Sequence, residues 1–462
     1  MTNVVWVVID DAHTSQFAPY SDVVPVAASI STPNITALAN AGVRFTNCFA
    51  QSSCSPARAE LMTMRYPIRN GIGQRVLSDD TTVVLEDEVL LPEMLRASPY
   101  FGESAEFGKW HLATDKTGGI DAPGQRGWDH YEAQYANFDT LAGESYVNWP
   151  RNVNGTVTTD TRYHTEALTD DFLTWVGTAP DEPWFAMVNF QAPHTPYHDP
   201  GVLAAESTGT HTDPISAGGS LSDQYKNMVA RLDFHLGEIV AGLDFSDTVL
   251  MVFADNGTPQ PIVESPYVSS NAKGTVKHTG TNVPLIVRGP TNVVVQAGRV
   301  ERSLVQMCDI TATTLDILGV DPRLSVPSEK VLDGRSFLPR LRDLPGVGAR
   351  RAVFTERTNP LRGTRPGSAL TRWDYCVRNE RFAIINENAQ LLFDGSGDRS
   401  FTQGEALYDY AGTGLSDQDI HEATDLLAAN ATRTDLQEAS LQNLRRERDA
   451  IFDSLEERLS LT

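Results

Sequence analysis

Cysteine is scarce in this chain of 462 residues. The four cysteines, Cys48, Cys54, Cys308 and Cys376, are scattered along the sequence, and none belongs to a C-x-x-C pair. This excludes a zinc site built on such pairs, because its ligands need that close spacing. We expect the four thiols to be reduced.

Positive charge is also in short supply. Lys and Arg total 37 against 60 Asp and Glu, so the formal net charge is -23. Such a surface repels polyanions, which argues against nucleic acid as the main partner. It also repels small anions at long range, so any anion site has to be a local cationic pocket.

Long hydrophobic runs are absent too. No window approaches the about 20 apolar residues that a membrane-spanning helix needs. The segment MTNVVWVVIDD has neither the basic region nor the small-residue cleavage site of a secretory signal. We therefore expect a cytoplasmic protein without a membrane partner. The sequence leaves its oligomeric state open.

Short β-branched runs alternate with helical segments through most of the chain. Continuous apolar runs, typical of strands buried on both faces of a parallel sheet, lie at 4–9, 184–190 and 248–254. A helix is expected between Thr32 and Gly42, and an amphipathic one across 225–239. The pattern predicts an α/β fold with a large doubly wound, mostly parallel sheet flanked by helices. By contrast, SPYFGESAEFGKW (98–110) has the composition of a loop.

The pattern changes after residue 345. Segments 382–387 and 389–394 are short and alternating, which predicts a modest antiparallel sheet, and a polar helix is expected over 434–460. We predict two domains: an α/β catalytic domain over 1–345 and a smaller α+β subdomain over 346–462.

Polar residues follow the predicted strands of the first domain. Asp10 and Asp11 follow the first strand, His194 the second, and Asp255 and Asn256 the third. Sites in open α/β sheets form beyond the carboxyl ends of strands, so we expect these residues to meet. The acidic and amide groups offer only oxygen ligands, which suits a hard cation such as Ca²⁺. Either pair taken alone could equally be a helix cap or a solvated turn.

The stretch QSSCSPARAELMTMR (51–65) raises a separate question about Cys54. Pro56 suits the first turn of a helix, so Cys54 would lie at the positive end of that helix and face an anion site. An inert buried cysteine, a thiolate nucleophile and a modified side chain all remain open on these residues alone.

A set of motifs adds a resemblance. C-S-P-A-R at 54–58 resembles the C-x-P-x-R signature of the type I, formylglycine-dependent sulfatases of the alkaline phosphatase superfamily. Further matches follow in the family's order: IDD at 9–11, FGKWHL at 107–112, APHTPY at 192–197, FADNG at 253–257, KGTVKHTGTNVPLIVRGP at 273–290 and LDGRSFLP at 332–339. The resemblance spans most of the chain and weakens after about residue 345.

The resemblance implies a modified nucleophile on one divalent cation. A formylglycine-generating enzyme would oxidise Cys54 to formylglycine, whose hydrate would attack the sulfur of a sulfate ester. The second hydroxyl of that hydrate would let the sulfated intermediate collapse. Ca²⁺ would be held by Asp10, Asp11, Asp255, Asn256 and the modified side chain of Cys54.

The resemblance also implies roles for five further residues. Arg58 would hold the hydrate and the metal, and Lys109 and Lys273 would neutralise the sulfate oxygens. His111 would be the base for the collapse step. His194, with Lys273, would assist the departing alcohol.

Two departures concern the rim of the pocket. His278-Thr279-Gly280 stands where the family often has Glu-Gly-Gly, and Asn282 stands where it often has Arg. We therefore consider Lys277 and His278 as candidates for substrate choice.

The resulting expectation is a sulfuric ester hydrolase, arylsulfatase-like, that acts on aryl or other small sulfate esters. A phosphonate monoester or phosphodiester hydrolase of the same superfamily is an alternative, although those relatives tend to have Asp-His where this chain has Asp255-Asn256. A catalytically silent binding protein is another alternative. It would not need both lysines and both histidines.

Overall fold

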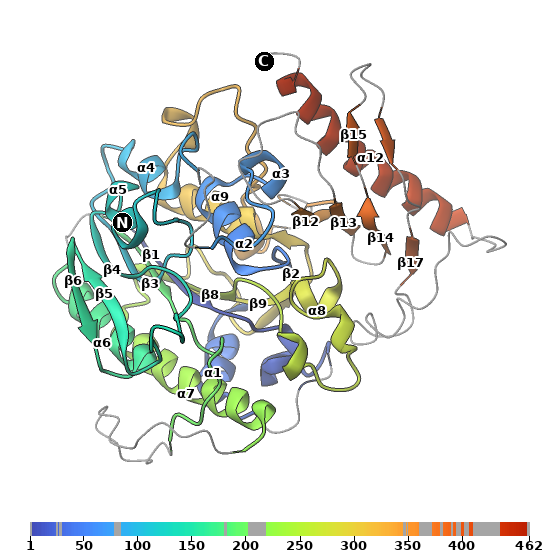
Figure 1. Ribbon diagram of the computed structural model, residues 1–462. Helices are drawn as coiled ribbons and strands as arrows, with labels where there is room; N and C mark the ends of the chain where they lie inside the picture. Colours follow the sequence, from blue (N-terminus) through green and yellow to red (C-terminus); the bar gives the residue numbers. More distant parts are fainter. Residues whose placement is uncertain are drawn as a thin grey trace.

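The computed structural model describes residues 2–24, 26, 30–77, 85–179, 183–201, 219–344, 348, 350–359, 372–378, 382–389, 391–393, 399–401, 406–409 and 435–459. Within these residues one large mixed sheet forms the centre of the molecule, and a smaller sheet lies to one side of it with the C-terminal helix (Figure 1).

The large sheet grows outward from a strand that is buried on both faces. Strand β1 (Asn3–Ile9) is apolar and β-branched, and all its residues from Val4 on are buried. Trp6 shows how one face is covered, because its indole Nε1 donates to Thr314 Oγ1 of a helix at 2.9 Å. β1 pairs in parallel with β7 (Phe185–Asn189) and β8 (Thr248–Ala254). These three strands are the ones that the sequence predicted.

The strand order of the large sheet is β10-β2-β9-β8-β1-β7-β3-β4-β5-β6, and β11 also pairs with β2. The run β8-β1-β7-β3-β4 is parallel, whereas β9 is antiparallel to both its neighbours and β5 and β6 are antiparallel at one edge. The remaining bounds are β2 Val43–Phe49, β3 Ser104–Lys109, β4 His130–Gln134, β5 Trp149–Val153, β6 Thr156–Asp160, β9 Asn282–Arg288, β10 Arg299–Glu301 and β11 Val305–Gln306. The predicted mostly parallel sheet is confirmed.

Helices cover both faces of this sheet. α2 and α9 pack together on one side, and α1, α6 and α7 pack together on the other (Figure 1). The α-helices of this region are α1 Pro33–Ala41, α2 Cys54–Thr63, α3 Pro67–Asn70, α4 Leu91–Arg96, α5 Ala122–Gln125, α6 His164–Val176, α7 Leu221–Gly242, α8 His278–Thr281, α9 Met307–Leu318 and α10 Leu338–Leu341. Short 3-10 helices occupy Thr14–Gln16, Ala18–Tyr20, Gly119–Asp121, Gln260–Ile262, Ser269–Asn271 and Pro322–Leu324. The expected helices near 33–42 and 225–239 are confirmed as α1 and α7.

The expectation of a loop at 98–110 is wrong over half of its length. Residues 104–109 form β3, which lies between β7 and β4 and is fully buried. The segment SAEFGK looked unlike a strand because it is polar and lacks β-branched residues. One oxygen of its polar side chain Glu106 is paired within the sheet, since Asn189 Nδ2 of β7 donates to Oε1 at 3.0 Å.

The C-terminal part contains the small antiparallel sheet that the sequence predicted. Its order is β12-β13-β14-β17, with a separate β15-β16 pair. The bounds are β12 Val353–Asn359, β13 Arg372–Arg378, β14 Phe382–Ala389, β15 Leu391–Phe393, β16 Arg399–Phe401, β17 Ala406–Asp409 and α12 Asp435–Leu459. The domain division at residue 345 stays a prediction. Among the described helices, none has the length and apolar character to cross a bilayer.

Candidate active site

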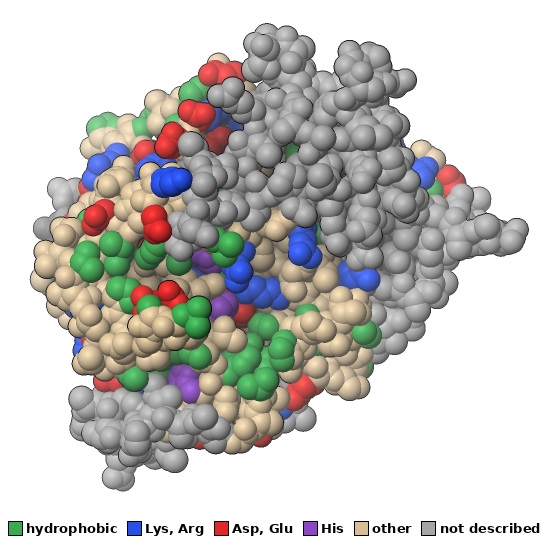
Figure 2. All heavy atoms as spheres, viewed as in Figure 1, with side chains coloured by type: hydrophobic (Ala, Val, Ile, Leu, Met, Phe, Trp, Pro, Cys, Tyr) green, Lys and Arg blue, Asp and Glu red, His purple; other side chains and the backbone are tan. Residues whose placement is uncertain are grey.

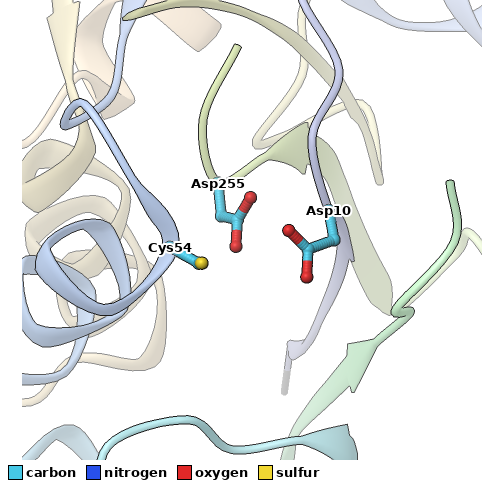
Figure 3. A group of neighbouring side chains, drawn as sticks. All are labelled: Asp10, Cys54 and Asp255. Carbon is cyan, nitrogen blue, oxygen red and sulfur yellow. The ribbon is translucent and has the colours of Figure 1, made fainter. Parts of the chain in front are cut away.

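Three acidic or sulfur-bearing side chains meet at one edge of the large sheet. Asp10 directly follows β1, and Asp255 directly follows β8, its parallel neighbour, so the two carboxylates come from adjacent strand ends. Cys54 approaches from the start of α2 (Figure 3). One ligand atom from each of the three lies within 4.8 Å of the others. The predicted convergence at the carboxyl edge is therefore present in the structure.

Helix α2 holds Cys54 in a completely enclosed position. Ser53 is the extended N-cap residue, Cys54 begins the helix, and Pro56 lies in the first turn, where a missing N–H leaves no bond unmade. All ten residues of α2 are buried. Burial raises the pKa of the Cys54 thiol, although Lys109 and Lys273 oppose the shift. These surroundings disfavour a thiolate nucleophile, which needs a lowered thiol pKa.

Arg58 ties the helix to the strand ends. Its Nε donates to Asp255 Oδ2 at 3.1 Å, and its Nη2 forms an ion pair with the same oxygen at 3.0 Å. On its other side, Nη1 donates to the carbonyl oxygen of Lys109 at 2.7 Å and to Asn189 Oδ1 at 3.0 Å. Because the guanidinium is held from two sides, the start of α2 and the end of β8 are fixed relative to each other.

Two lysines face the first acidic pair. Lys109 Nζ forms an ion pair with Asp10, and Lys273 Nζ forms one with Asp11. Burial would raise the pKa of Asp10, but these lysines together with nearby His194 and Arg58 hold it well below its ordinary value. Burial lowers the pKa of Lys273, but Asp11, Cys54, Asp10 and Asp255 together raise it above its ordinary value, so Lys273 keeps its proton.

The carboxylates of the site lie close enough to oppose one another's ionisation. Burial and the neighbouring Asp10 raise the pKa of Asp255 to about 7 in spite of Arg58. Among the described residues, no hydrogen-bond partner reaches the buried oxygens Asp10 Oδ1 and Asn256 Oδ1. Asn256 is oriented by its Nδ2, which donates to Asp11 Oδ1 at 2.6 Å. Closely spaced carboxylates and buried oxygens without a partner among the described residues are what a hard divalent cation would satisfy, so these residues fit such an ion.

Both predicted histidines lie at this site and are neutral. Burial lowers the pKa of His194 to about 4 and holds that of His111 well below its ordinary value. His194 Nε2 lies 3.7 Å from Asp11 Oδ2. His111 adopts a positive φ of 57°, its Nε2 lies 3.1 Å from Val76 O, and its Nδ1 has no hydrogen-bond partner in the described part of the chain. A neutral ring nitrogen without a partner is free to accept a proton.

The structure thus brings together the ten residues that the sequence singled out. They are Asp10, Asp11, Cys54, Arg58, Lys109, His111, His194, Asp255, Asn256 and Lys273. Figure 2 shows Lys, Arg and His side chains gathered around a hollow on one face, and Lys273 and His194 are the partly exposed members, at 18% and 12%. Because the protein is acidic overall, the sequence predicted that any anion site would need such a local concentration of cationic groups. The individual catalytic roles stay predictions.

The departures from the family pattern lie deeper than the rim. His278 is 2% exposed, and its Nδ1 lies 3.2 Å from Nε2 of the buried His13. Asn282 Oδ1 accepts a bond from Thr14 Oγ1 at 2.7 Å. His278 of α8 and Asn282 of β9 therefore connect these two elements to the segment after β1. Lys277 is the more exposed of the two candidates for substrate choice.

Close backbone contact joins two of the motifs. A Cβ atom on Gly257, directly after Asp255 and Asn256, would lie 1.9 Å from the carbonyl oxygen of Thr279. Gly257 N also donates to the carbonyl oxygen of Gly280 at 3.0 Å. Only glycine fits here, which explains the last letter of FADNG.

Several supporting residues were missed by sequence reasoning. Tyr225 of α7 donates its hydroxyl to the carbonyl oxygen of Asp11 at 2.8 Å, although the sequence offered it only as an apolar position of the helix. Asn189 was hidden in the predicted strand 184–190, where one polar residue at the carboxyl end was the available signal. Arg357 of β12 donates from Nη1 to the carbonyl oxygen of Gly274 at 2.6 Å, and nothing in the sequence pointed to it.

The fold and the site define an α/β protein with a candidate active site at the carboxyl ends of parallel strands. A family model described as Sulfatase matches residues 2–320, and the chain belongs to the sulfatase family.

Two similar proteins of known sequence are named as sulfatases. The chain is 27% identical over 346 residues to the uncharacterized sulfatase YdeN of Escherichia coli (strain K12), a match that covers 69% of this chain and 58% of that protein. It is 26% identical over 396 residues to the N-acetylgalactosamine-6-sulfatase of Homo sapiens, covering 78% of this chain and 69% of the human enzyme.

Solved structures share the fold. Ps i-CgsB in complex with k-i-k-neocarrahexaose has a TM-score of 0.72 at 21% identity, covering 97% of this chain and 92% of that chain. The phosphonate monoester hydrolase of Agrobacterium radiobacter has a TM-score of 0.64 at 22% identity, covering 97% and 96%. At these identities the similarity is one of architecture, and it does not separate sulfate from phosphonate substrates.

Proposed function

We propose that this protein hydrolyses sulfate esters of aryl or other small alcohols, with a formylglycine made from Cys54 as its nucleophile. The observation that carries the proposal is the meeting of Cys54, Asp10 and Asp255 beside the guanidinium of Arg58. The surroundings of Cys54 disfavour its use as a thiolate, and its place at the helix start is the one that the family signature requires. An inert structural cysteine would have no need of flanking cations and carboxylates.

The proposal includes one Ca²⁺ ion. Asp10, Asp11, Asp255 and Asn256, with the converted side chain of residue 54, would hold it through oxygen atoms. When bound, the ion would make a hydroxyl on residue 54 more acidic and would offset charge on the sulfate. The unpaired buried oxygens of Asp10 and Asn256 support this assignment.

The side chains of the site can each do one part of the hydrolysis. Lys109 and Lys273, both charged, would bind the sulfate oxygens and stabilise the charge that develops on them. His111, neutral and with a free ring nitrogen, would accept a proton from the hydrate. Lys273, beside His194, keeps a proton that it could donate to the departing alcohol oxygen.

Conversion of Cys54 would need a formylglycine-generating enzyme as a transient partner. The Cys54 side chain is 0% exposed in the folded chain. A second protein would therefore have to reach this residue before α2 packs.

The test combines mass and activity measurements. In protein purified from its native host, conversion of the thiol to the aldehyde lowers the intact mass by about 18 Da. We expect converted protein to hydrolyse 4-nitrophenyl sulfate, Cys54→Ala to lose this activity, and Cys48→Ala, which alters another fully buried cysteine outside the site, to keep it.

Three results would overturn the proposal. If Cys54→Ala hydrolysed the sulfate ester as fast as the parent, residue 54 could not supply the nucleophile. A clear preference for the matched aryl phosphonate ester would replace the sulfate substrate with a phosphonate. A native protein with an entirely unmodified Cys54 would favour the silent binding protein.

A further inference from the structure

A line of buried polar groups leads from the middle of the large sheet to Arg58. Glu106 of β3 is 0% exposed and Asn189, the last residue of β7, is 1% exposed. The two strands are parallel neighbours, and Asn189 Nδ2 donates to Glu106 Oε1 at 3.0 Å. Asn189 Oδ1, at the other end of the amide, accepts from Arg58 Nη1 at 3.0 Å.

The line continues into the cation-binding group. The same guanidinium donates from Nε to Asp255 Oδ2 at 3.1 Å, and its Nη2 forms an ion pair with that oxygen at 3.0 Å. Glu106, Asn189, Arg58 and Asp255 therefore form one continuous series of contacts. Glu106 itself does not belong to the set of residues that meet at the site.

Glu106 determines which end of the Asn189 amide faces Arg58. An amide carries a donor at one end and an acceptor at the other, and Arg58 can only donate. With an acceptor at position 106, the NH₂ group is drawn toward β3 and the oxygen is left for the guanidinium. Without that acceptor, the amide can turn and place its donors against those of Arg58.

Keeping a carboxyl group in this place is costly for the fold. Glu106 Oε2 is buried and has no hydrogen-bond partner among the described residues, and burial raises the pKa of this side chain to about 8. A neutral apolar residue would pack in the sheet without that cost. This cost is explained if the carboxyl group of Glu106 orients a neighbouring side chain.

We propose that Glu106 and Asn189 are positioning residues that fix the Arg58 guanidinium against Asp255, and through it the carboxylate that faces the divalent cation. The catalytic part of this inference rests on the proposed function, whereas the part that concerns Arg58 and cation binding does not. Residues that do not bind the metal but hydrogen-bond to its ligands typically contribute about 10- to 100-fold to metal affinity or activity.

The test compares Glu106→Gln, which keeps an acceptor oxygen, with Glu106→Met and Asn189→Ala, which remove the contact. We expect Glu106→Gln to stay within about 2-fold of the parent, since the amide can still orient Asn189. Glu106→Met and Asn189→Ala should lower kcat at least about 10-fold with little change in KM, and should raise the Ca²⁺ dissociation constant of the unconverted protein by a similar factor.

Asn152→Ala is the matched control for losing a buried amide. Asn152 of β5 is 0% exposed and donates to Ile120 O at 3.0 Å and to Asp121 Oδ1, away from the site. Its variant should lose thermal stability and keep both kcat and Ca²⁺ affinity. Calorimetric titration with Ca²⁺ and steady-state kinetics on 4-nitrophenyl sulfate give the two readouts.

Crystal structures of Glu106→Met and the parent separate this inference from the proposed function. We expect the Arg58 side chain to leave Asp255 in the variant. If Arg58 stays in place, or if Glu106→Met matches the parent in kcat and Ca²⁺ affinity, the positioning role is wrong. If instead the converted parent hydrolyses no sulfate ester, the proposed function is wrong. The positioning role of Glu106 is still tested in that case, by whether Arg58 leaves Asp255 in the Glu106→Met structure.

Discussion

The large sheet and the small C-terminal sheet contribute to the site in different ways. Asp10 and Asp255, which directly follow strands β1 and β8 of the large sheet, lie at the proposed active site. The small sheet contributes β12, which forms hydrogen bonds with the loops next to this site. Glu356 N donates to Gln51 Oε1 at 2.9 Å, and Gln51 Nε2 donates to Phe354 O at 3.2 Å.

The contacts of β12 reach the segment before Cys54 and the loop that carries Lys273. Ser52, two residues before Cys54, donates its hydroxyl to Glu356 O at 3.3 Å and accepts from Gly274 N at 2.7 Å. Arg357 donates to Gly274 O, next to Lys273. The comparison teaches that one sheet supplies reactive groups, while the other sets the position of the loops that carry them.

The largest effect is expected at a reactive group of the large sheet. Lys109→Met should lower kcat/KM on 4-nitrophenyl sulfate by about 1000-fold, because it removes a buried cation that is positioned for the developing charge. Steady-state kinetics measure the loss. Lys226→Met, which alters a surface pair with Glu264, is the control and should leave the rate unchanged. A Lys109→Met enzyme as fast as the parent would contradict the division between the sheets.

A stability effect of intermediate size is expected where the two sheets meet. Gln51→Leu leaves the N–H of Glu356 and the carbonyl of Phe354 without their partner, so the free energy of unfolding should fall by about 2 kcal/mol. Urea denaturation followed by circular dichroism measures it. Gln442→Leu on the exposed face of α12 should cause no such fall. An unchanged urea midpoint for Gln51→Leu would show that the contact between the sheets is dispensable.

The smallest effect is expected at Arg357, the cationic residue of β12 that donates to Gly274 O next to Lys273. Arg357→Ala should lower kcat/KM by about 10-fold, since a charged hydrogen bond that holds the Lys273 loop is lost. Arg357→Lys should recover part of the rate because its ammonium can still donate to Gly274 O. Kinetics on 4-nitrophenyl sulfate distinguish the variants. Equal rates for the parent and Arg357→Ala would restrict the small sheet to a structural role.

The part of the fold that the sequence predicted is the part where burial leaves a strong pattern. β1, β7 and β8 are buried on both faces, so they appear as continuous apolar runs that need no knowledge of their neighbours. β3 was missed for the opposite reason. Its residues Ser104 and Glu106 look solvent-facing, and only the hydrogen bond from Asn189 makes Glu106 compatible with the interior.

The same distinction applies to the site. Strand ends and the C-x-P-x-R pattern pointed to the residues that face the centre, because their chemistry can be recognised from residue type and local spacing. The supporting residues could not be found in this way. Glu106 and Asn189 are 83 positions apart, and Arg357 and Gly274 are also 83 positions apart, so their contacts depend on the strand order and on how the second sheet packs.

The contact at Gly257 has a consequence for how this chain can vary. A methyl group at that position would force the turn at Thr279 and Gly280 outward, and with it the segment that begins at Lys273. The ion pair between Lys273 and Asp11 would then open, although neither residue had changed. Mutational scanning should therefore find position 257 as intolerant as Asp10 and Asp255, despite its lack of any functional group.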